Sequence, residues 1–237
     1  MCTWKGDGIL ISIIDRCEQK YFISNEQYES LLNKIVDKLC KDEYFFETIY
    51  NLYFDNDGFE LINKSLDKPE YKEKIRLRSY EIVNGNSVVF LEIKKKYNDH
   101  TNKRRIIIKY DDYLNYINDG IVPKCDRQIF KEIDYCFKKY LLKPKIKIRY
   151  DRTSYYLKDD KDFRITFDNN VRYSLDNLDF TKFDSEDSLL FKDGYIMEFK
   201  TFNGIPLWLN KILSELKIYP TSFSKVGKIC EGECKNV

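Results

Sequence analysis

Alternation of charged and apolar residues, one by one along short segments, constrains the fold of this chain more than any other feature. In segment 73–82 it puts Lys74, Arg76 and Arg78 on one side of an extended chain and apolar residues on the other. Further segments are predicted to be strands at 16–24, 48–55, 87–97, 103–110, 145–151, 163–168 and 195–201. We therefore expect an antiparallel sheet with one apolar and one charged face.

Apolar residues at helical spacing predict a few helices beside this sheet. Residues Ser24 to Gln27 form a capping-box pattern, and apolar residues follow them at the spacing of an amphipathic helix. Further helices are expected at 59–66, 123–140 and 206–216. The 237 residues contain no Gly/Pro/Ser linker and no internal repeat, so we expect one domain of the α+β class, with peripheral tails at 1–14 and 229–237.

Composition argues against several classes of protein. The formal net charge is only +2, which gives no reason to expect generic binding to nucleic acid or to a membrane surface. The apolar stretch 8–14 is too short to span a bilayer and lacks the cleavage pattern of a secretory signal. Seven scattered cysteines fit neither a disulfide framework nor a zinc site, so we expect a cytoplasmic location and assign Cys230 and Cys234 to the tail. The single histidine, His100, is interpreted as solvated.

The charged face recurs on many of the predicted strands. Its members are Arg16, Glu18, Lys20, Lys74, Arg76, Arg78, Glu92, Lys94, Lys103, Arg105, Arg152, Arg164, Glu198 and Lys200. A sheet whose mixed charges face water is the simpler alternative. If the sheet closes into a barrel, however, these side chains converge on one interior, where unpaired cations would repel one another. A chain of phosphates would neutralise them, because arginine and lysine both bind phosphate oxygens through charge-assisted hydrogen bonds.

Glutamates interspersed among these cations would supply ligands for a divalent metal, which phosphoryl transfer normally uses. Neither G-x-x-x-x-G-K-[ST] nor G-x-G-x-x-G occurs in the sequence, so the usual glycine loops that hold a nucleotide are absent. A cage of side chains is the route that remains for binding a triphosphate.

Short motifs follow one another in the order and spacing of a known family. They are N-L-Y-F-D-N at 51–56, R-L-R-S-Y at 76–80, E-I-K at 92–94, K-R-R at 103–105, Y-D-R-T at 150–153, R-I-T-F-D at 164–168, M-E-F-K at 197–200 and F-S-K at 223–225. Through these motifs the chain resembles the VTC domain, the catalytic unit of vacuolar transporter chaperone polyphosphate polymerases in the triphosphate tunnel metalloenzyme superfamily. The resemblance implies a closed antiparallel β-barrel tunnel with a polar, basic interior and flanking α-helices.

The resemblance also implies roles for individual residues. Phosphate binding is expected of Lys20, Arg76, Arg78, Lys94, Lys103, Arg152, Arg164 and Lys225. The catalytic set is expected to be Arg76, Arg78, Lys94, Arg152, Arg164 and Glu198, with Glu198 as a metal ligand. Glu18 and Glu92 face the tunnel by strand parity, and would either bind metal or balance charge. Lys200 and Arg105 share these faces, where salt bridges are an equal alternative.

Two features depart from the best-known eukaryotic members of the family. Ser222 stands where they carry a lysine ahead of F-S-K, which removes one cation and puts chain-length handling in question. The phosphate-sensing domain and membrane helices that accompany those members do not appear in this sequence, so sensing and translocation are not assigned to it. A separate membrane-protein partner is left open.

The expected activity is that of a polyphosphate polymerase, which uses Mn²⁺ or Mg²⁺ to transfer the terminal phosphate of ATP to a growing polyphosphate chain. Two alternatives share the tunnel: a triphosphatase acting on inorganic triphosphate or nucleotides, and a noncatalytic sensor of polyphosphate or nucleotide. An RNA-binding domain ranks last. In such a domain exposed aromatic residues would interleave with the basic ones, whereas in this sequence the aromatic residues mostly fall on the opposite face. The oligomeric state is not indicated. If the empty cage holds mutually repelling cations, removing Arg152 should not lower stability.

Overall fold

The computed structural model describes residues 17–67, 69–98, 100–183 and 187–233. Its strands are β1 (Cys17–Ile23), β2 (Leu39–Asp55), β3 (Tyr71–Ser79), β4 (Val88–Tyr97), β5 (His100–Lys109), β6 (Lys143–Leu157), β7 (Asp160–Ser174), β8 (Ser188–Leu189) and β9 (Tyr195–Thr201). Its helices are α1 (Asn25–Ile35), α2 (Glu60–Leu66), α3 (Tyr110–Asp119), α4 (Arg127–Tyr140), α5 (Leu207–Glu215) and α6 (Lys225–Glu233), with a short 3-10 helix η1 (Val36–Lys38). The expected tail at 1–14 lies outside the described residues.

One antiparallel sheet of nine strands organises the molecule. Its order is β1-β9-β7-β6-β2-β3-β4-β5, with β8 paired to β7. Within the described part of the chain β1 and β5 stand at the two ends of this order and do not pair, so the hydrogen-bonded closure of a barrel expected from the sequence is not formed. A side-chain contact crosses between distant strands instead: Nζ of Lys94 on β4 lies 3.3 Å from a carboxylate oxygen of Glu18 on β1. The sheet is therefore open but strongly curved, with its charged face inside.

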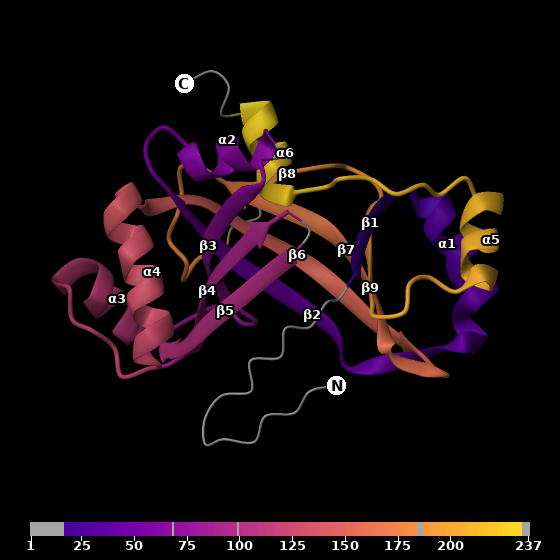
Figure 1. Ribbon diagram of the computed structural model, residues 1–237, viewed down its shortest axis with the longest axis horizontal. Coiled ribbons are helices and arrows are strands. Elements are labelled where there is room, and N and C mark those ends of the chain that lie inside the picture. The colour runs from indigo at the N-terminus through magenta and orange to yellow at the C-terminus, as the bar shows by residue number, and fades with distance from the viewer. Residues whose placement is uncertain (1–16, 68, 99, 184–186, 234–237) are drawn as a thin grey trace.

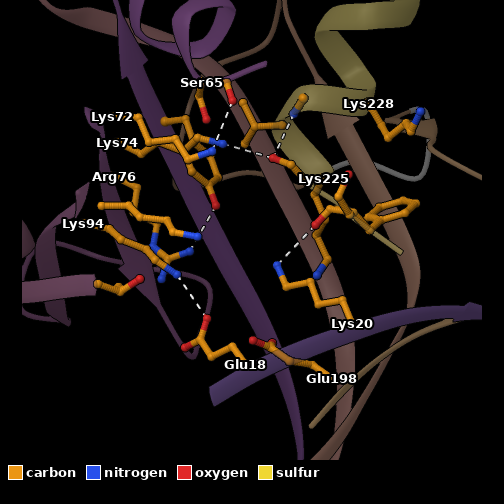
Figure 2. A pocket seen from close by; sticks show the side chains of 18 of the residues that line it. Glu18, Lys20, Ser65, Lys72, Lys74, Arg76, Lys94, Glu198, Lys225 and Lys228 are labelled. Atoms are coloured by element: carbon orange, nitrogen blue, oxygen red, sulfur yellow. Dashed lines mark hydrogen bonds and ion pairs between the residues drawn. The ribbon is translucent and has the colours of Figure 1, made fainter. Parts of the chain in front are cut away.

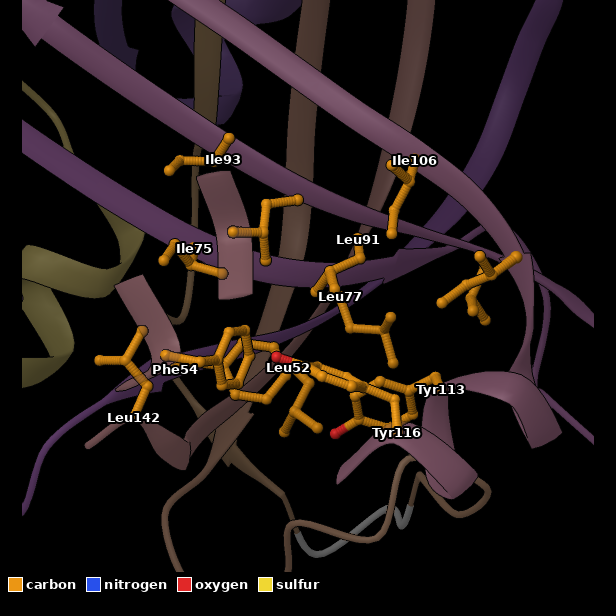
Figure 3. Packing of buried hydrophobic residues seen from close by; sticks show 14 of the residues in the cluster. Leu52, Phe54, Ile75, Leu77, Leu91, Ile93, Ile106, Tyr113, Tyr116 and Leu142 are labelled. Atoms are coloured by element: carbon orange, nitrogen blue, oxygen red, sulfur yellow. The ribbon is translucent and has the colours of Figure 1, made fainter. Parts of the chain in front are cut away.

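Helices cover the sheet at three places. Alternation along β3 and β4 sends Ile75, Leu77 and Leu91 toward α3 and α4, where they pack with buried tyrosines (Figure 3). A second apolar cluster joins α1 and α5 to β1, β7 and β9, and a third joins α2 and α6 to β6. Figure 1 shows α3 with α4 at one end, α1 with α5 at the other, and α2 with α6 at the upper rim. These clusters fix the strands whose opposite faces carry the charges.

Most of the expected elements form where the sequence predicts them. The capping box at the start of α1 is confirmed, because the Ser24 hydroxyl accepts from the Gln27 N–H and the Gln27 side chain accepts from the Ser24 N–H. The central strands are longer than predicted, since β2 and β6 pair with each other from Leu39 to Asp55 across two irregularities in register. Tertiary pairing thus extends strands beyond the segments of clear alternation.

One helix was not predicted, and one expected tail was wrong. Segment 110–119 was not predicted to be a helix, yet α3 forms and buries Tyr110, Tyr113 and Tyr116. The expected tail from residue 229 onward begins inside α6, and Ile229 and Cys230 are each only 1% exposed. His100 begins β5 opposite Tyr97 and is exposed, as expected of a solvated histidine. No helix among the described residues is long and apolar enough to cross a membrane.

Candidate functional site

A cavity of about 1090 Å³ lies against the charged face of the sheet and the start of α6. Twelve Lys and Arg side chains and five Glu side chains are among its described lining residues, an excess of seven positive charges. The whole chain has a net charge of only +2, so positive charge is concentrated here. Figure 2 shows Lys72, Lys74, Arg76 and Lys94 on one wall, opposite Lys20, Lys225 and Glu198. The charge of the cavity therefore favours the binding of an anion of several charges.

The register of the strands brings these side chains together. On β3, Arg76 stands directly opposite Tyr53 of β2 and Glu92 of β4, and directly opposed residues point to the same face of a sheet. On the other wall, Lys20 of β1 stands opposite Glu198 of β9. Each wall thus alternates cations with groups that can orient them.

Glu92 is the centre of the first cluster. Its carboxylate lies 2.7 Å from Nη2 of Arg76 and 2.8 Å from Nζ of Lys103, and 3.9 Å from Nε of Arg78. Burial of Glu92 would raise its pKa, but Arg76, Arg78 and Lys103 together lower it to about 2. Glu92 is therefore ionised at neutral pH and holds three cations toward the cavity.

Asp168 on β7 is the centre of the second cluster. Arg152 donates to both of its oxygens, at 2.6 and 2.8 Å, and Lys225 donates to one of them at 2.5 Å. Burial opposes ionisation of Asp168, yet the charges of Arg152 and Lys225 hold its pKa well below the usual range. The bidentate contact fixes the plane of the Arg152 guanidinium, which leaves its remaining donors in a defined direction.

Two tyrosines lie between these clusters. The hydroxyl of Tyr53 accepts a hydrogen bond of 3.0 Å from Nη1 of Arg76, and burial, which would raise its pKa, is outweighed by Arg76 and Arg78, which lower it to about 8. The ring of Tyr150 lies 4.0 Å from Nζ of Lys225, in a cation–π contact. The two tyrosines thus add contacts to Arg76 and Lys225, whose positive charges the carboxylates do not fully neutralise.

Lysines of the cavity are poorly solvated. Nζ of Lys74 donates to the hydroxyl of Ser224 at 3.0 Å, and burial lowers the pKa of Lys74 to about 8. Burial is also the main cause that lowers the pKa of Lys103 to about 8, with Arg76 adding to it and Glu92 opposing it. The pKa of Lys200 is lowered mainly by burial as well. A bound polyanion would relieve this strain by neutralising the lysines.

Glu198 is the carboxylate that best fits a divalent metal. Its ion pair with Lys200 is long, at 3.8 Å. Burial would raise the pKa of Glu198, but Lys200, Lys20 and Arg152 lower it to about 2, so it is ionised. In the described part of the chain no three His, Cys, Asp or Glu side chains gather as a metal site. A single carboxylate that shares the ion with substrate phosphates is nonetheless a usual arrangement for Mg²⁺.

The cavity brings together nearly all of the residues proposed from the sequence. Its lining includes Glu18, Lys20, Arg76, Arg78, Glu92, Lys94, Lys103, Arg152, Glu198, Lys200 and Lys225. Arg164 and Arg105 are not among the lining residues. Arg164 stands opposite Lys200 and Tyr156, so it shares the charged face further along the sheet, where it contacts Asp42.

Other residues of the cavity were not predicted from the sequence, or were noted there without a role in the site. Lys72, Lys96 and Lys228 line the cavity but were not proposed as site residues, and Lys74 was noted only as part of a strand pattern. Asp168 was recognised as part of a motif without a role. Its position, opposite Arg152 in adjacent strands, was the signal that could have assigned it. Lys228 lies beyond the predicted helices, so no alternation marked it.

Comparisons with known proteins agree with this geometry. The model of the VTC domain matches residues 15–230. The vacuolar transporter chaperone complex subunit 4 of Schizosaccharomyces pombe is 27% identical over 146 residues, which are 52% of this chain and 20% of the relative, so the chain spans about a fifth of that protein's length.

Two solved structures were compared with this chain. One, from Bacillus halodurans and described as a candidate adenylate cyclase, gives a TM-score of 0.53 at 15% identity, covering 87% of this chain and 92% of the other. A protein of Pyrococcus horikoshii gives 0.49 at 16% identity, covering 93% and 99%. At these identities the likeness to the first structure concerns the fold alone.

Proposed function

This chain belongs to the VTC domain family, and on that premise we propose that it is a metal-dependent polyphosphate polymerase. Its substrates would be ATP and the end of a growing polyphosphate chain. The observation that carries the proposal is the excess of seven positive charges around one cavity in a chain of nearly balanced charge. Inorganic polyphosphate is a flexible polyanion that such a cavity would neutralise along its length.

The proposed reaction needs no side-chain nucleophile. A terminal oxygen of the polyphosphate acceptor attacks the γ-phosphorus of ATP, a new P–O–P bond forms, the bond between the γ-phosphorus and the bridging oxygen breaks, and ADP leaves with that oxygen. The acceptor oxygen is already ionised at neutral pH, so no base has to remove a proton from it. Catalysis would then rest on positioning and on neutralising charge in the transition state.

The arginines would do most of the positioning. Arg76, Arg78 and Arg152 are held by Glu92, Asn51 and Asp168 before any ligand arrives, so little reorganisation accompanies binding. Lys20, Lys94, Lys103 and Lys225 would bind phosphate oxygens as point charges around them. We assign Arg164 to phosphates beyond the cavity, because it lies further along the same face.

Glu198 would hold the divalent metal together with phosphate oxygens of the substrate. When bound, Mn²⁺ or Mg²⁺ would supply further neutralisation of the transferring phosphoryl group. Glu18 and Glu92 are better explained as charge partners, since each already contacts a lysine or arginine of the cavity. Only Glu198 is therefore proposed as a metal ligand from the protein.

A triphosphatase is the second candidate, and one residue favours it. Glu47 on β2 stands opposite Arg152, and burial raises its pKa against the opposing charges of Arg152 and Arg78. A carboxyl group with a raised pKa on this face could accept a proton from water, which would then attack the terminal phosphorus and release orthophosphate. The polymerase remains preferred because the motifs and the family both point to it.

We also propose a cellular location and a partner for this protein. Five described cysteines are free, which fits the reducing cytoplasm, where ATP is available. The matched relative is by name a subunit of a complex, so we propose that this chain also has a separate protein partner, with a membrane protein as the candidate. No nucleic-acid partner is proposed.

Product analysis tests the activity. The purified protein is incubated with ATP and Mn²⁺ or Mg²⁺, and the products are resolved as polyphosphate, orthophosphate or unchanged ATP. Polyphosphate that lengthens with time supports the polymerase. Orthophosphate without polyphosphate would support the triphosphatase, and unchanged ATP that is nonetheless bound would indicate a sensor.

A further inference from the structure

Beside the cavity, the charged face of β3, β4 and β5 ends in a patch of apolar side chains. The patch consists of Tyr80, Val88, Phe90 and Ile107, and we call it the mouth shelf. Tyr80 is 39% exposed, Val88 52% and Ile107 56%. Exposed apolar side chains that lie together on the binding face of a small domain indicate a contact surface more often than isolated ones do.

Strand register makes the mouth shelf continuous with the phosphate site. Phe90 stands directly opposite Arg78, which lines the cavity, and on its other side opposite Ile107. Glu92, which holds Arg76, is two residues further along the same strand, a distance of about 7 Å. If a nucleotide bound with its phosphates at Arg76 and Arg78, the part of it beyond the phosphates would therefore reach the mouth shelf across about the length of one ribose.

The side chains of the mouth shelf are arranged around aromatic rings. The rings of Tyr80 and Phe90 meet nearly at right angles, at 78°, with their centroids 5.6 Å apart. The guanidinium of Arg105 lies 4.8 Å from the centre of the Phe90 ring. Phe90 is thus held between Tyr80 and Arg105, whereas a large part of Tyr80 faces solvent.

We propose that the mouth shelf binds the nucleobase of the nucleoside triphosphate, with the base stacked on the exposed ring of Tyr80 while Phe90, itself in contact with Arg105, supports that ring. The inference rests on the proposed function, since it names where the non-phosphate part of ATP lies. Stacking of bases on tyrosine and arginine is tolerant of base identity. Tyr80 would then make this chain prefer nucleotides over inorganic triphosphate, which has no group to cover the mouth shelf.

Binding measurements separate the base from the phosphates. The affinities of the full chain for ATP and for inorganic triphosphate are measured with Mg²⁺ by titration calorimetry, for wild type, Tyr80→Ala and Tyr80→Phe. Tyr80→Ala should weaken ATP binding at least about fivefold, the weak end of base–aromatic stacking, and leave triphosphate binding unchanged. Tyr80→Phe keeps the ring and should bind both like wild type. Tyr135→Ala, at a tyrosine on α4 that is 62% exposed and lies outside the mouth shelf, serves as the control.

Each other result overturns the inference in a distinguishable way. Equal weakening of ATP and triphosphate by Tyr80→Ala would mean that Tyr80 supports the phosphate site instead. Unchanged ATP binding would mean that the base lies elsewhere or that the mouth shelf serves a protein partner, and the polymerase proposal would stand. A wild-type chain that binds neither ligand would remove both proposals. Tyr80 is substantially exposed, so a folded variant is expected.

Discussion

At the scale of single residues, the cavity depends on buried carboxylates as much as on cations. Glu92 and Asp168 are 1% and 2% exposed, and each holds at least two positive side chains. Repulsion among the cations is therefore already partly compensated in the empty protein. Removing a cation would leave a buried carboxylate with less positive charge beside it, and would also weaken phosphate binding. The effects on stability and on binding therefore have to be measured separately.

Arg152→Ala is expected to show this double effect. The sequence-based expectation was that stability would not fall, but the substitution would leave Asp168 buried with Lys225 as its remaining partner. Breaking a buried ion pair by removing one member costs about 3–5 kcal/mol, and the remaining lysine should keep the loss in unfolding free energy near the lower end. Triphosphate binding should weaken by about 1.5–3 kcal/mol, the size of a hydrogen bond to a charged group.

Chemical denaturation and calorimetry would check both values for Arg152→Ala. Lys20→Ala is the matched control, because Lys20 donates to the backbone carbonyl of Phe223 and, within the described part of the chain, is not held by an ion pair with a carboxylate. It should weaken triphosphate binding with little loss of stability. An Arg152→Ala protein as stable as wild type would show that Asp168 is not the centre of a structural cluster.

Glu198→Gln tests the proposed metal ligand. The amide keeps the shape of the side chain but lacks the charge that a hard cation needs, so turnover should fall by about 100-fold or more, a loss typical of electrostatic groups in an active site. Triphosphate binding without metal should be unchanged or tighter, because the pocket becomes more positive. The effect of Mn²⁺ on triphosphate affinity should disappear. Retention of full metal-dependent activity would exclude Glu198 as the ligand.

At the scale of elements, local signals predicted some parts of the fold and tertiary contacts determined others. The alternation of β3 and the capping box at Ser24 are local, and both appear in the structure as predicted. In α3 the helix is rich in Tyr, Asp and Asn, which are weak helix formers, and burial of its tyrosines against β5 and α4 stabilises it. Helix propensities alone do not predict such a helix.

Much of the candidate site was predictable because strand parity fixes which side chains share a face. Parity gave Lys74, Arg76 and Arg78 one side of β3, and the cavity uses all three. Parity does not give the position of a residue along the length of the sheet, which depends on strand register. Parity therefore could not reveal that Arg164 lies beyond the cavity. Nor could it find residues that α6 contributes, because α6 reaches the site through packing on α2.

Ile229→Ala tests the structural role of α6, which the sequence reading had assigned to a tail. Ile229 is 1% exposed in the cluster that joins α2, α6 and β6, so truncation should lower the unfolding free energy by about 2–5 kcal/mol. Triphosphate binding should also weaken, because a loosened α6 carries Lys225. Leu207→Ala on α5, where the side chain is 80% exposed, should change neither quantity. An Ile229→Ala protein with wild-type thermal stability would contradict the packing of α6.

At the scale of the whole molecule, positive charge is concentrated in the cavity at a cost to the empty protein. Burial lowers the pKa of Lys74 and of Lys103 to about 8, from an ordinary value of 10.5. Between these two values the unfolded chain binds more protons than the folded one, so the unfolding free energy contributed by these groups rises with pH from about 8 toward 10.5. Below pH 8 the lysines are charged in both states, and their burial penalty is present in full.

Ligand binding should respond to pH in the opposite direction. Phosphate binding needs Lys74 and Lys103 charged, and Tyr53, whose pKa is also about 8, gains a negative charge beside Arg76 as pH rises. From pH 7 to 9 the ligand-free protein should therefore become more stable while its affinity for triphosphate falls. Thermal melts with and without triphosphate would measure both, and Lys74→Gln, compared at each pH, would cancel the titration of the ligand itself. The pH dependence should be smaller in Lys74→Gln than in wild type; equal slopes would show that Lys74 is not a charge the cavity holds for its substrate.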